Sequence, residues 1–258
     1  MDEKLKSLRK FNLVMGMFHF VQGAIMLYIS LNVEKVINFK PQIMSYFLKF
    51  DQTQMRLVTD QKELFTIPYG ILVSVFLFLS ALFHFIVYSK TFNTKYNEGL
   101  AKNMNAFRWY EYSLSSSIMI TLIAVLFGIY DIGALILIFG LNASMNLFGL
   151  LMEKINQYTA KTDWTAFIYG SIAGILPWVV IIMYAFGNSN PLEVPWFVYA
   201  IFGSYLFFFN IFPINMILQY KKVGKWSDYL YGEKVYITLS LVAKSVLAWL
   251  VFFGVMQP

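Results

Sequence analysis

The chain has no cysteine and two histidines, and charged residues make up only 13% of its 258 positions. The lack of cysteine excludes disulfides, thiolate chemistry and cysteine-ligated metals. With so few histidines and 14 carboxylates, we expect no dedicated metal site. Soluble domains usually carry about 25% charged residues. The low charge therefore argues against a soluble enzyme, a disordered chain and a nucleic-acid-binding protein.

Apolar side chains make up most of the remainder, with 59% of the residues hydrophobic. A helix that crosses a bilayer needs about 20 apolar residues. Runs of that length predict seven spans, at residues 11–32, 65–88, 104–129, 131–153, 163–187, 193–220 and 230–256. The first run is about 19 residues long, which exceeds the apolar core of a signal peptide, and no small-x-small cleavage site follows it. We predict an all-α membrane protein, with residues 1–258 forming a single seven-helix domain.

The connection between the first two spans is much longer than the others. Residues 33–64 form a polar segment, whereas residues 130–131 and 187–193 are short turns. A connection of about 30 residues usually has structure of its own. The alternation near residues 33–39 and 55–59 allows short β-strands there.

Lysine and arginine gather on one side of the predicted domain. The N-terminal segment and the loops after the even-numbered spans hold Lys4, Lys6, Arg9, Lys10, Lys90, Lys95, Lys102, Lys154, Lys161, Lys221, Lys222, Lys225 and Lys234. The other side has lysines and arginines only in residues 33–64. Cytoplasmic loops carry an excess of basic residues. We therefore predict a multi-pass protein of the cell membrane, with a cytoplasmic N-terminus, an extracellular first loop and an extracellular C-terminus.

Two cations remain, Arg108 and Lys244, and both lie within predicted spans. Ionisable side chains inside a membrane are costly and mark function by default. Lys244 lies near the middle of the last span, too deep for its amine to reach the interface easily. Two interpretations stay open for it: structural pairing with a carboxylate, or a desolvated reactive amine suited to forming a Schiff base.

The expected partner of Lys244 is Glu111 in the third span, which we take as the only carboxylate well inside any span. The third and seventh spans run in the same direction. Because side chains tilt toward the helix N-terminus, the two charged ends can reach the same depth. Arg108 lies three residues before Glu111 on the same helical face. It is either part of this site or an interfacial anchor.

Other polar residues of the spans fall near these charges. His19 and His84 lie on the side of Glu111, as members of a polar network or as hydrogen-bonded packing residues. Ser113, Ser115, Ser116 and Ser117 could bond the carboxylate or ease helix packing. Ser240 precedes Lys244 by one turn. The aromatic residues of the fifth and sixth spans suit packing, and they also suit a flat conjugated ligand.

This combination resembles a retinal-binding rhodopsin, with a lysine in the seventh span and a carboxylate in the third. Ordinary type-1 rhodopsins usually carry an Arg-Tyr-x-Asp-like motif in the third helix and have an extracellular N-terminus. Here the third span carries Arg-Trp-Tyr-Glu-Tyr-Ser at residues 108–113, and Ser240 lies four residues before Lys244. Together with the long first loop and the inverted charge distribution, these motifs resemble the heliorhodopsins over all seven spans.

The resemblance implies a role for each matching residue. Lys244 would carry all-trans retinal as a protonated Schiff base, and Glu111 would be its counterion. Ser240 would lie near the Schiff base, and the chromophore site would also include Tyr112, Ser115 and Asn142. A cytoplasmic-side polar network would include His19, His84, Arg108 and Asn105. The resemblance further implies a homodimer helped by the first loop and, for some members, a cytoplasmic partner such as glutamine synthetase.

The leading interpretation is a light sensor in which retinal isomerises to 13-cis during a slow photocycle without ion pumping. A pump usually needs a proton donor and an acceptor on opposite sides of the Schiff base, and Glu111 is expected to stand alone. The main alternative is a light-gated passive proton channel with Glu193 near its outer mouth. A third possibility is a retinal-free membrane scaffold held by a Lys244–Glu111 ion pair. No enzyme activity is expected, since no catalytic domain is attached.

Overall fold

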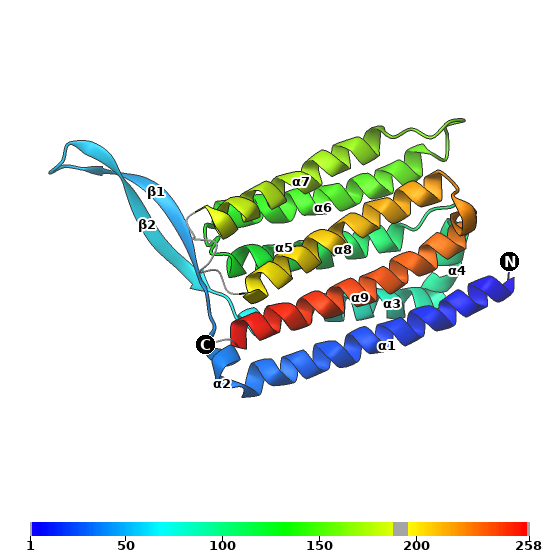
Figure 1. Cartoon of the computed structure of the whole chain (residues 1–258), viewed down its shortest axis with the longest axis horizontal. Helices are drawn as coiled ribbons and strands as arrows, with labels where there is room; N and C mark the ends of the chain where they lie inside the picture. Colours follow the sequence, from blue (N-terminus) through cyan, green and yellow to red (C-terminus); the bar gives the residue numbers. More distant parts are fainter. Residues whose placement is uncertain (1, 188–195, 257–258) are drawn as a thin grey trace.

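The computed structural model describes residues 2–187 and 196–256, and within them seven helices are long and apolar enough to cross a membrane. They are α1 (Asp2–Asn32), α3 (Tyr69–Tyr88), α5 (Ala106–Leu126), α6 (Ile132–Ile155), α7 (Thr165–Phe186), α8 (Trp196–Tyr220) and α9 (Tyr229–Met256). Figure 1 shows them side by side in one bundle. The predicted seven-helix membrane fold is confirmed. We call the end that carries the start of α1 the N-terminal end, and the opposite end the hairpin end.

The helix bounds follow the predicted spans closely, with three differences. Helix α1 starts at Asp2, well before the apolar run begins at residue 11. Residues 65 and 66 belong to a strand, so the second spanning helix begins only at Tyr69, after Pro68. Residues 193–195, which were predicted to open the sixth span, lie outside the described part of the chain.

The first long loop folds into a two-stranded antiparallel sheet that projects beyond the hairpin end of the bundle (Figure 1). Strand β1 (Gln42–Asp51) pairs with β2 (Arg56–Thr66), and Phe50 is opposite Leu57. In the turn, the carboxylate of Asp51 accepts hydrogen bonds from the backbone amides of Thr53 and Gln54, 2.8 and 3.0 Å away. The prediction of strands in this loop is confirmed, and the strands are long rather than short.

Three short segments differ from the prediction or were missed. Residues 33–39, expected to allow a strand, contain the short helix α2 (Glu34–Asn38), because only Val36 among its residues turns into the core. Helix α4 (Lys90–Ala101) and the 3₁₀ turn η1 (Gly224–Ser227) were not predicted. Helix α4 is polar and buries only Tyr96 and Leu100, so its sequence lacks the long apolar run of a membrane span. It lies at the N-terminal end of the bundle (Figure 1).

The interior differs between the two ends of the bundle. Toward the hairpin end, the core is apolar and includes Ile120, Ile123, Leu247 and Val251. Large apolar residues on the outer faces, such as Ile172 on α7, remain exposed, as expected of helices that face lipid. Helix α8 is the least embedded of the seven spanning helices, and its buried residues are Ile201, Tyr205, Asn215, Met216 and Gln219.

Candidate functional site

The structure brings Lys244 and Glu111 into direct contact inside the bundle. The Lys244 Nζ on α9 lies 2.5 Å from Glu111 Oε1 on α5, and the two side chains are 4% and 7% exposed. Ser80 on α3 joins the pair: its Oγ accepts from the lysine amine and donates to the same carboxylate oxygen, at 2.6 Å in each case. A buried ion is tolerated only when a partner and further hydrogen bonds replace its water. These three side chains supply that replacement for one another.

Ser80 is a site residue that the sequence did not point to. Serine is common in membrane helices, and the same apolar run also holds Ser74 and His84, so nothing in the sequence marks Ser80 as the partner of Lys244. Ser240, which was expected near the amine, is buried one turn before Lys244 and lines a small cavity beside Glu111. Ser115 is fully buried one turn after Glu111, and its hydroxyl lies close to the Glu111 carboxylate.

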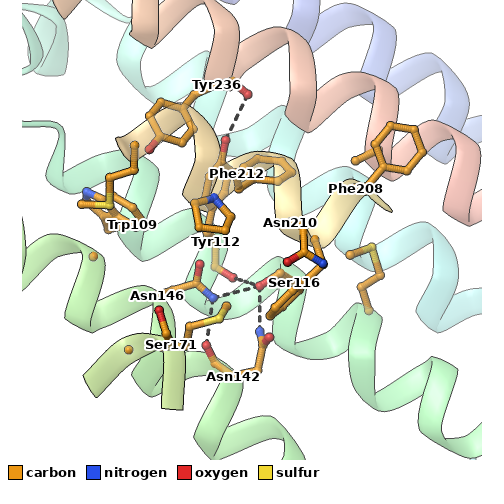
Figure 2. A pocket seen from close by; sticks show the side chains of 18 of the residues that line it. Trp109, Tyr112, Ser116, Asn142, Asn146, Ser171, Phe208, Asn210, Phe212 and Tyr236 are labelled. Carbon is orange, nitrogen blue, oxygen red and sulfur yellow. Dashed lines mark hydrogen bonds between the residues drawn. The ribbon is translucent and has the colours of Figure 1, made fainter. Parts of the chain in front are cut away.

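A larger cavity of about 230 Å³ opens beside the amine of Lys244. Its lining comes from α5, α6, α7, α8 and α9, and it extends from Lys244 to Ser171 and Ile175 on α7. Figure 2 shows the aromatic side chains of its wall, among them Trp109, Phe212 and Tyr236. The ring of Tyr112 also faces the cavity, and its centroid lies 5.2 Å from Lys244 Nζ. At that distance, an aromatic face attracts a cation.

One part of this cavity wall is polar. The amide nitrogen of Asn142 donates to the hydroxyls of Ser116 and Ser117, at 2.8 and 3.0 Å. Asn146 donates to Ser116 as well, at 3.1 Å, and Figure 2 shows the three groups together. Asn142 therefore lines the same cavity as Lys244, but across it, on α6.

The two histidines meet on the N-terminal side of the Lys244–Glu111 pair. The rings of His19 on α1 and His84 on α3 stack with their centroids 5.5 Å apart. His84 Nδ1 lies 2.8 Å from the side-chain oxygen of Asn12. His84 also lines the small cavity beside Glu111.

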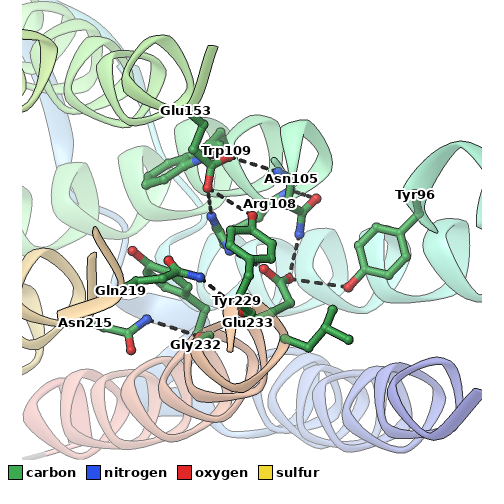
Figure 3. A network of polar contacts seen from close by, with 12 residues as sticks. Tyr96, Asn105, Arg108, Trp109, Glu153, Asn215, Gln219, Tyr229, Gly232 and Glu233 are labelled. Carbon is green, nitrogen blue, oxygen red and sulfur yellow. Dashed lines mark hydrogen bonds and ion pairs between the residues drawn. The ribbon is translucent and has the colours of Figure 1, made fainter. Parts of the chain in front are cut away.

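Two further carboxylates are buried in the bundle besides Glu111, and both lie near helix ends. Glu153 on α6 and Glu233 on α9 are each 1% exposed. Both accept from the guanidinium of Arg108, which pairs with them and not with Glu111 (Figure 3). Arg108 is therefore neither an interfacial anchor nor a partner of Glu111. The sequence reading missed the two carboxylates because each lies near a helix end, where charges usually face water.

Asn105 ties this second group of charges together. Its side-chain oxygen caps α5 by accepting from the Arg108 amide, at 3.2 Å. Its side-chain nitrogen donates to Glu233 at 2.6 Å, and its backbone amide donates to Glu153 at 2.9 Å. Arg108 and Asn105 thus bond Glu153 and Glu233 directly, and a polar chain through Tyr96 and Asn12 connects Glu233 to His84. A buried arginine in a span requires buried carboxylates, and that requirement is the sequence signal that could have found them.

Trp109 connects the large cavity to the second charge group. Its ring lines the cavity, and its indole nitrogen donates to Glu153 at 2.8 Å. The ring packs directly on Gly149 of α6, where an added Cβ would meet ring atoms well inside van der Waals contact. Glycine at position 149 therefore makes room for the indole.

The comparisons with known proteins give one family. The family model described as Heliorhodopsin matches residues 8–256. No curated protein matches the chain. Within the described ranges, no group of three or more His, Cys, Asp and Glu side chains could hold a metal ion.

We predict that Gly149→Ala destabilises the protein, because the rigid indole of Trp109 must move away from the new methyl group. Overpacking of this kind costs about 1–3 kcal/mol. The measurement is the thermal unfolding midpoint in detergent or nanodiscs. The matched control is Gly140→Ala on the same helix, where an added Cβ meets nothing within 4 Å. Equal midpoints for the two variants would contradict the close packing of Trp109 on Gly149.

Proposed function

Because the chain belongs to the heliorhodopsin family, we propose that it is a light sensor that carries all-trans retinal as a protonated Schiff base on Lys244. The family supports a rhodopsin-type light-sensing function, in a photoreceptor-type membrane protein rather than a classical enzyme. The observation that carries the proposal is the position of the Lys244 amine, which meets Glu111 on one side and opens onto the aromatic-lined cavity on the other.

The residues around the cavity fit this cofactor. The wall is mainly apolar and aromatic, as a polyene requires, and its one amine is that of Lys244. When bound, retinal supplies visible absorption and a double bond that light isomerises from all-trans to 13-cis. Glu111 is the proposed counterion, held by Ser80, and it stabilises positive charge on the Lys244 nitrogen. Tyr112, Ser115, Ser240 and Asn142 are proposed to line the chromophore site.

We further propose a slow photocycle without ion pumping. Toward the hairpin end, the bundle beyond Lys244 is filled by apolar side chains such as Leu247 and Val251. In that half of the described structure, the buried hydroxyls of Ser30, Ser74 and Tyr69 are all bonded to backbone carbonyls. The buried charged side chains lie instead at the depth of Lys244 or nearer the N-terminal end. Glu193, considered as the mouth of a passive channel, lies outside the described residues.

The first test concerns the chromophore. We expect a visible absorption band after addition of retinal, no such band in Lys244→Ala, and a red-shifted band in Glu111→Gln. The shift follows because loss of the carboxylate charge removes stabilisation of ground-state positive charge near the nitrogen. Glu98→Gln, on the exposed face of α4, is the matched control and leaves the band in place. Circular dichroism checks that each variant is folded.

An unchanged spectrum in Glu111→Gln would remove Glu111 from the counterion role. A visible band that persists in Lys244→Ala would mean that retinal is attached to another residue. If retinal produces no visible band in the wild-type protein, the Lys244–Glu111 ion pair of a retinal-free scaffold becomes the better account.

The second test separates a sensor from a light-gated proton channel. We expect no photocurrent in voltage-clamped cells that express the retinal-loaded protein, because the apolar half of the bundle gives protons no continuous polar path. A reproducible passive current under illumination, at a voltage where ordinary leak is subtracted, would replace the sensor proposal with the channel.

The orientation proposed from the loop charges places the N-terminus in the cytoplasm and the hairpin and C-terminus outside. Since the chain has no cysteine, single introduced cysteines report the sides cleanly. We expect Gln52→Cys, in the exposed turn of the hairpin, to react with a membrane-impermeant maleimide on intact cells. Tyr158→Cys, also exposed, in the loop between α6 and α7, should react only after lysis. The reverse pattern would invert the proposed topology.

We also propose that two copies of the chain form a homodimer through the hairpin. Tyr46, Leu48 and Phe50 alternate along β1 and so share one face of the sheet, which is apolar and exposed. Leu48→Cys should then crosslink between two chains more readily than Lys49→Cys on the opposite face.

The proposed cytoplasmic partner is a soluble enzyme such as glutamine synthetase. If that enzyme does not bind the protein in nanodiscs, it is excluded as the partner.

A further inference from the structure

The Arg108 group contains more buried negative charge than positive charge. One guanidinium is shared by the carboxyls of Glu153 and Glu233, and the three side chains are 4%, 1% and 1% exposed. The Lys244–Glu111 pair, by contrast, is balanced. Among the described residues, the ion pairs of Glu153 and Glu233 are those with Arg108. A buried carboxylate without a countercharge is costly, and proteins usually avoid that cost by leaving the group neutral.

Glu153 is the carboxyl better suited to remain ionised. Besides Arg108, it accepts from the backbone amide of Asn105, the indole of Trp109 and the hydroxyl of Tyr229, the last at 3.1 Å. Each of its two oxygens thus accepts two hydrogen bonds. A carboxylate that accepts this many hydrogen bonds binds a proton weakly, because its lone pairs are already occupied.

Glu233 is the carboxyl that can hold a proton. One of its oxygens pairs with Arg108, and the other accepts from the Asn105 amide. The second oxygen also lies 3.4 Å from the hydroxyl of Tyr96 on α4, the longest contact in the group. A phenol hydroxyl can both donate and accept, so it can receive a hydrogen bond from a protonated Glu233. Burial raises the pKa of Tyr96 well above its ordinary value, so this phenol keeps its own proton.

The titratable and charged groups that face Glu233 come from several helices. They are Tyr96 on α4, Arg108 and Tyr112 on α5, Glu153 on α6, and Tyr229 and Tyr236 on α9 itself. Of these, Arg108 is the cation, and it already serves Glu153 (Figure 3).

A short polar route leads from Glu233 toward the Lys244–Glu111 pair. Tyr96 is 3.4 Å from the amide nitrogen of Asn12, whose oxygen is 2.8 Å from His84 Nδ1. Beside this chain lies a cavity of about 40 Å³, and its lining includes Glu233 and Glu111. A site of that size with polar walls has room for roughly two or three waters. Both carboxyls thus border the same space.

We propose that Glu233 is a protonated carboxylic acid in the resting protein, and that it can pass this proton through the shared cavity to the Glu111 carboxylate, which leaves Glu233 ionised and Glu111 neutral until the proton returns. The proton neutralises the excess charge of the Arg108 group. A change in charge at Lys244 or Glu111 is then felt by the Glu233 proton, which lies nearer the N-terminal end. The resting proton is independent of the proposed function, whereas its response to light rests on that function.

The resting proton can be tested without retinal. In solid-state NMR of protein with ¹³C-labelled glutamate in lipid at neutral pH, we expect one carboxylic acid signal apart from the carboxylates. Glu233→Gln should abolish it. Glu153→Gln should also abolish it, because a single carboxylate then balances Arg108 and no proton is needed. Glu98→Gln, at an exposed position, should leave it unchanged.

Absence of an acid signal in the wild-type protein would overturn the proposal, whatever the variants do. Persistence of the signal in Glu233→Gln would also overturn it, because the proton would then belong to another carboxyl. Persistence of the acid signal in Glu153→Gln would contradict the argument that Glu233 holds its proton to balance the charge of the Arg108 group.

The exchange is tested in retinal-loaded protein by light-induced infrared difference spectroscopy. We expect illumination to perturb the carbonyl stretch of a protonated carboxylic acid in the wild type and not in Glu233→Gln. A wild-type difference spectrum without that band would overturn the exchange. If the protein has no visible absorption, this measurement reports failure of the retinal proposal, and the NMR result still decides the resting proton.

Discussion

The cost of a charge inside an apolar bundle is the constraint on which this structure depends. Lys244 can lie deep in α9 only because Glu111 and Ser80 reach it from two other helices. The same requirement holds for Arg108, whose guanidinium meets carboxyls from α6 and α9. Removing one partner of such a buried pair typically costs about 3–5 kcal/mol. The charges therefore fix which helices are neighbours and at what depth, while the apolar packing around them is less specific.

These two charge groups also explain how the bundle divides along its length. All the buried charges lie at the level of Lys244 or nearer the N-terminal end, and the hairpin end is filled with isoleucine, valine and phenylalanine. This asymmetry suits a protein in which a change near Lys244 is transmitted to one membrane surface.

The sequence predicted those features that depend on long runs or on single unusual residues. Seven apolar runs gave the seven helices, and the depths of Lys244 and Glu111 placed their charged ends within reach of each other. Glu153 and Glu233 were missed because a charge near a helix end faces water in most proteins. Here α4 and the last turns of neighbouring helices cover that end, which only the tertiary structure reveals. Ser80 could not be found, since a lone serine in a membrane helix most often bonds its own backbone. Ser80 does so too, in addition to bonding Glu111.

Under the proposed retinal binding, the position of Trp109 has a consequence for attempts to change the absorption of the protein. Its ring is part of the cavity wall, and its nitrogen donates a hydrogen bond to the Glu153 carboxyl. A substitution that tunes absorption at Trp109 therefore also alters the electrostatics of a cluster that does not touch the chromophore cavity. Phe212 lines the same cavity without such a bond, so spectral engineering can begin there and leave the proton chemistry of the protein intact.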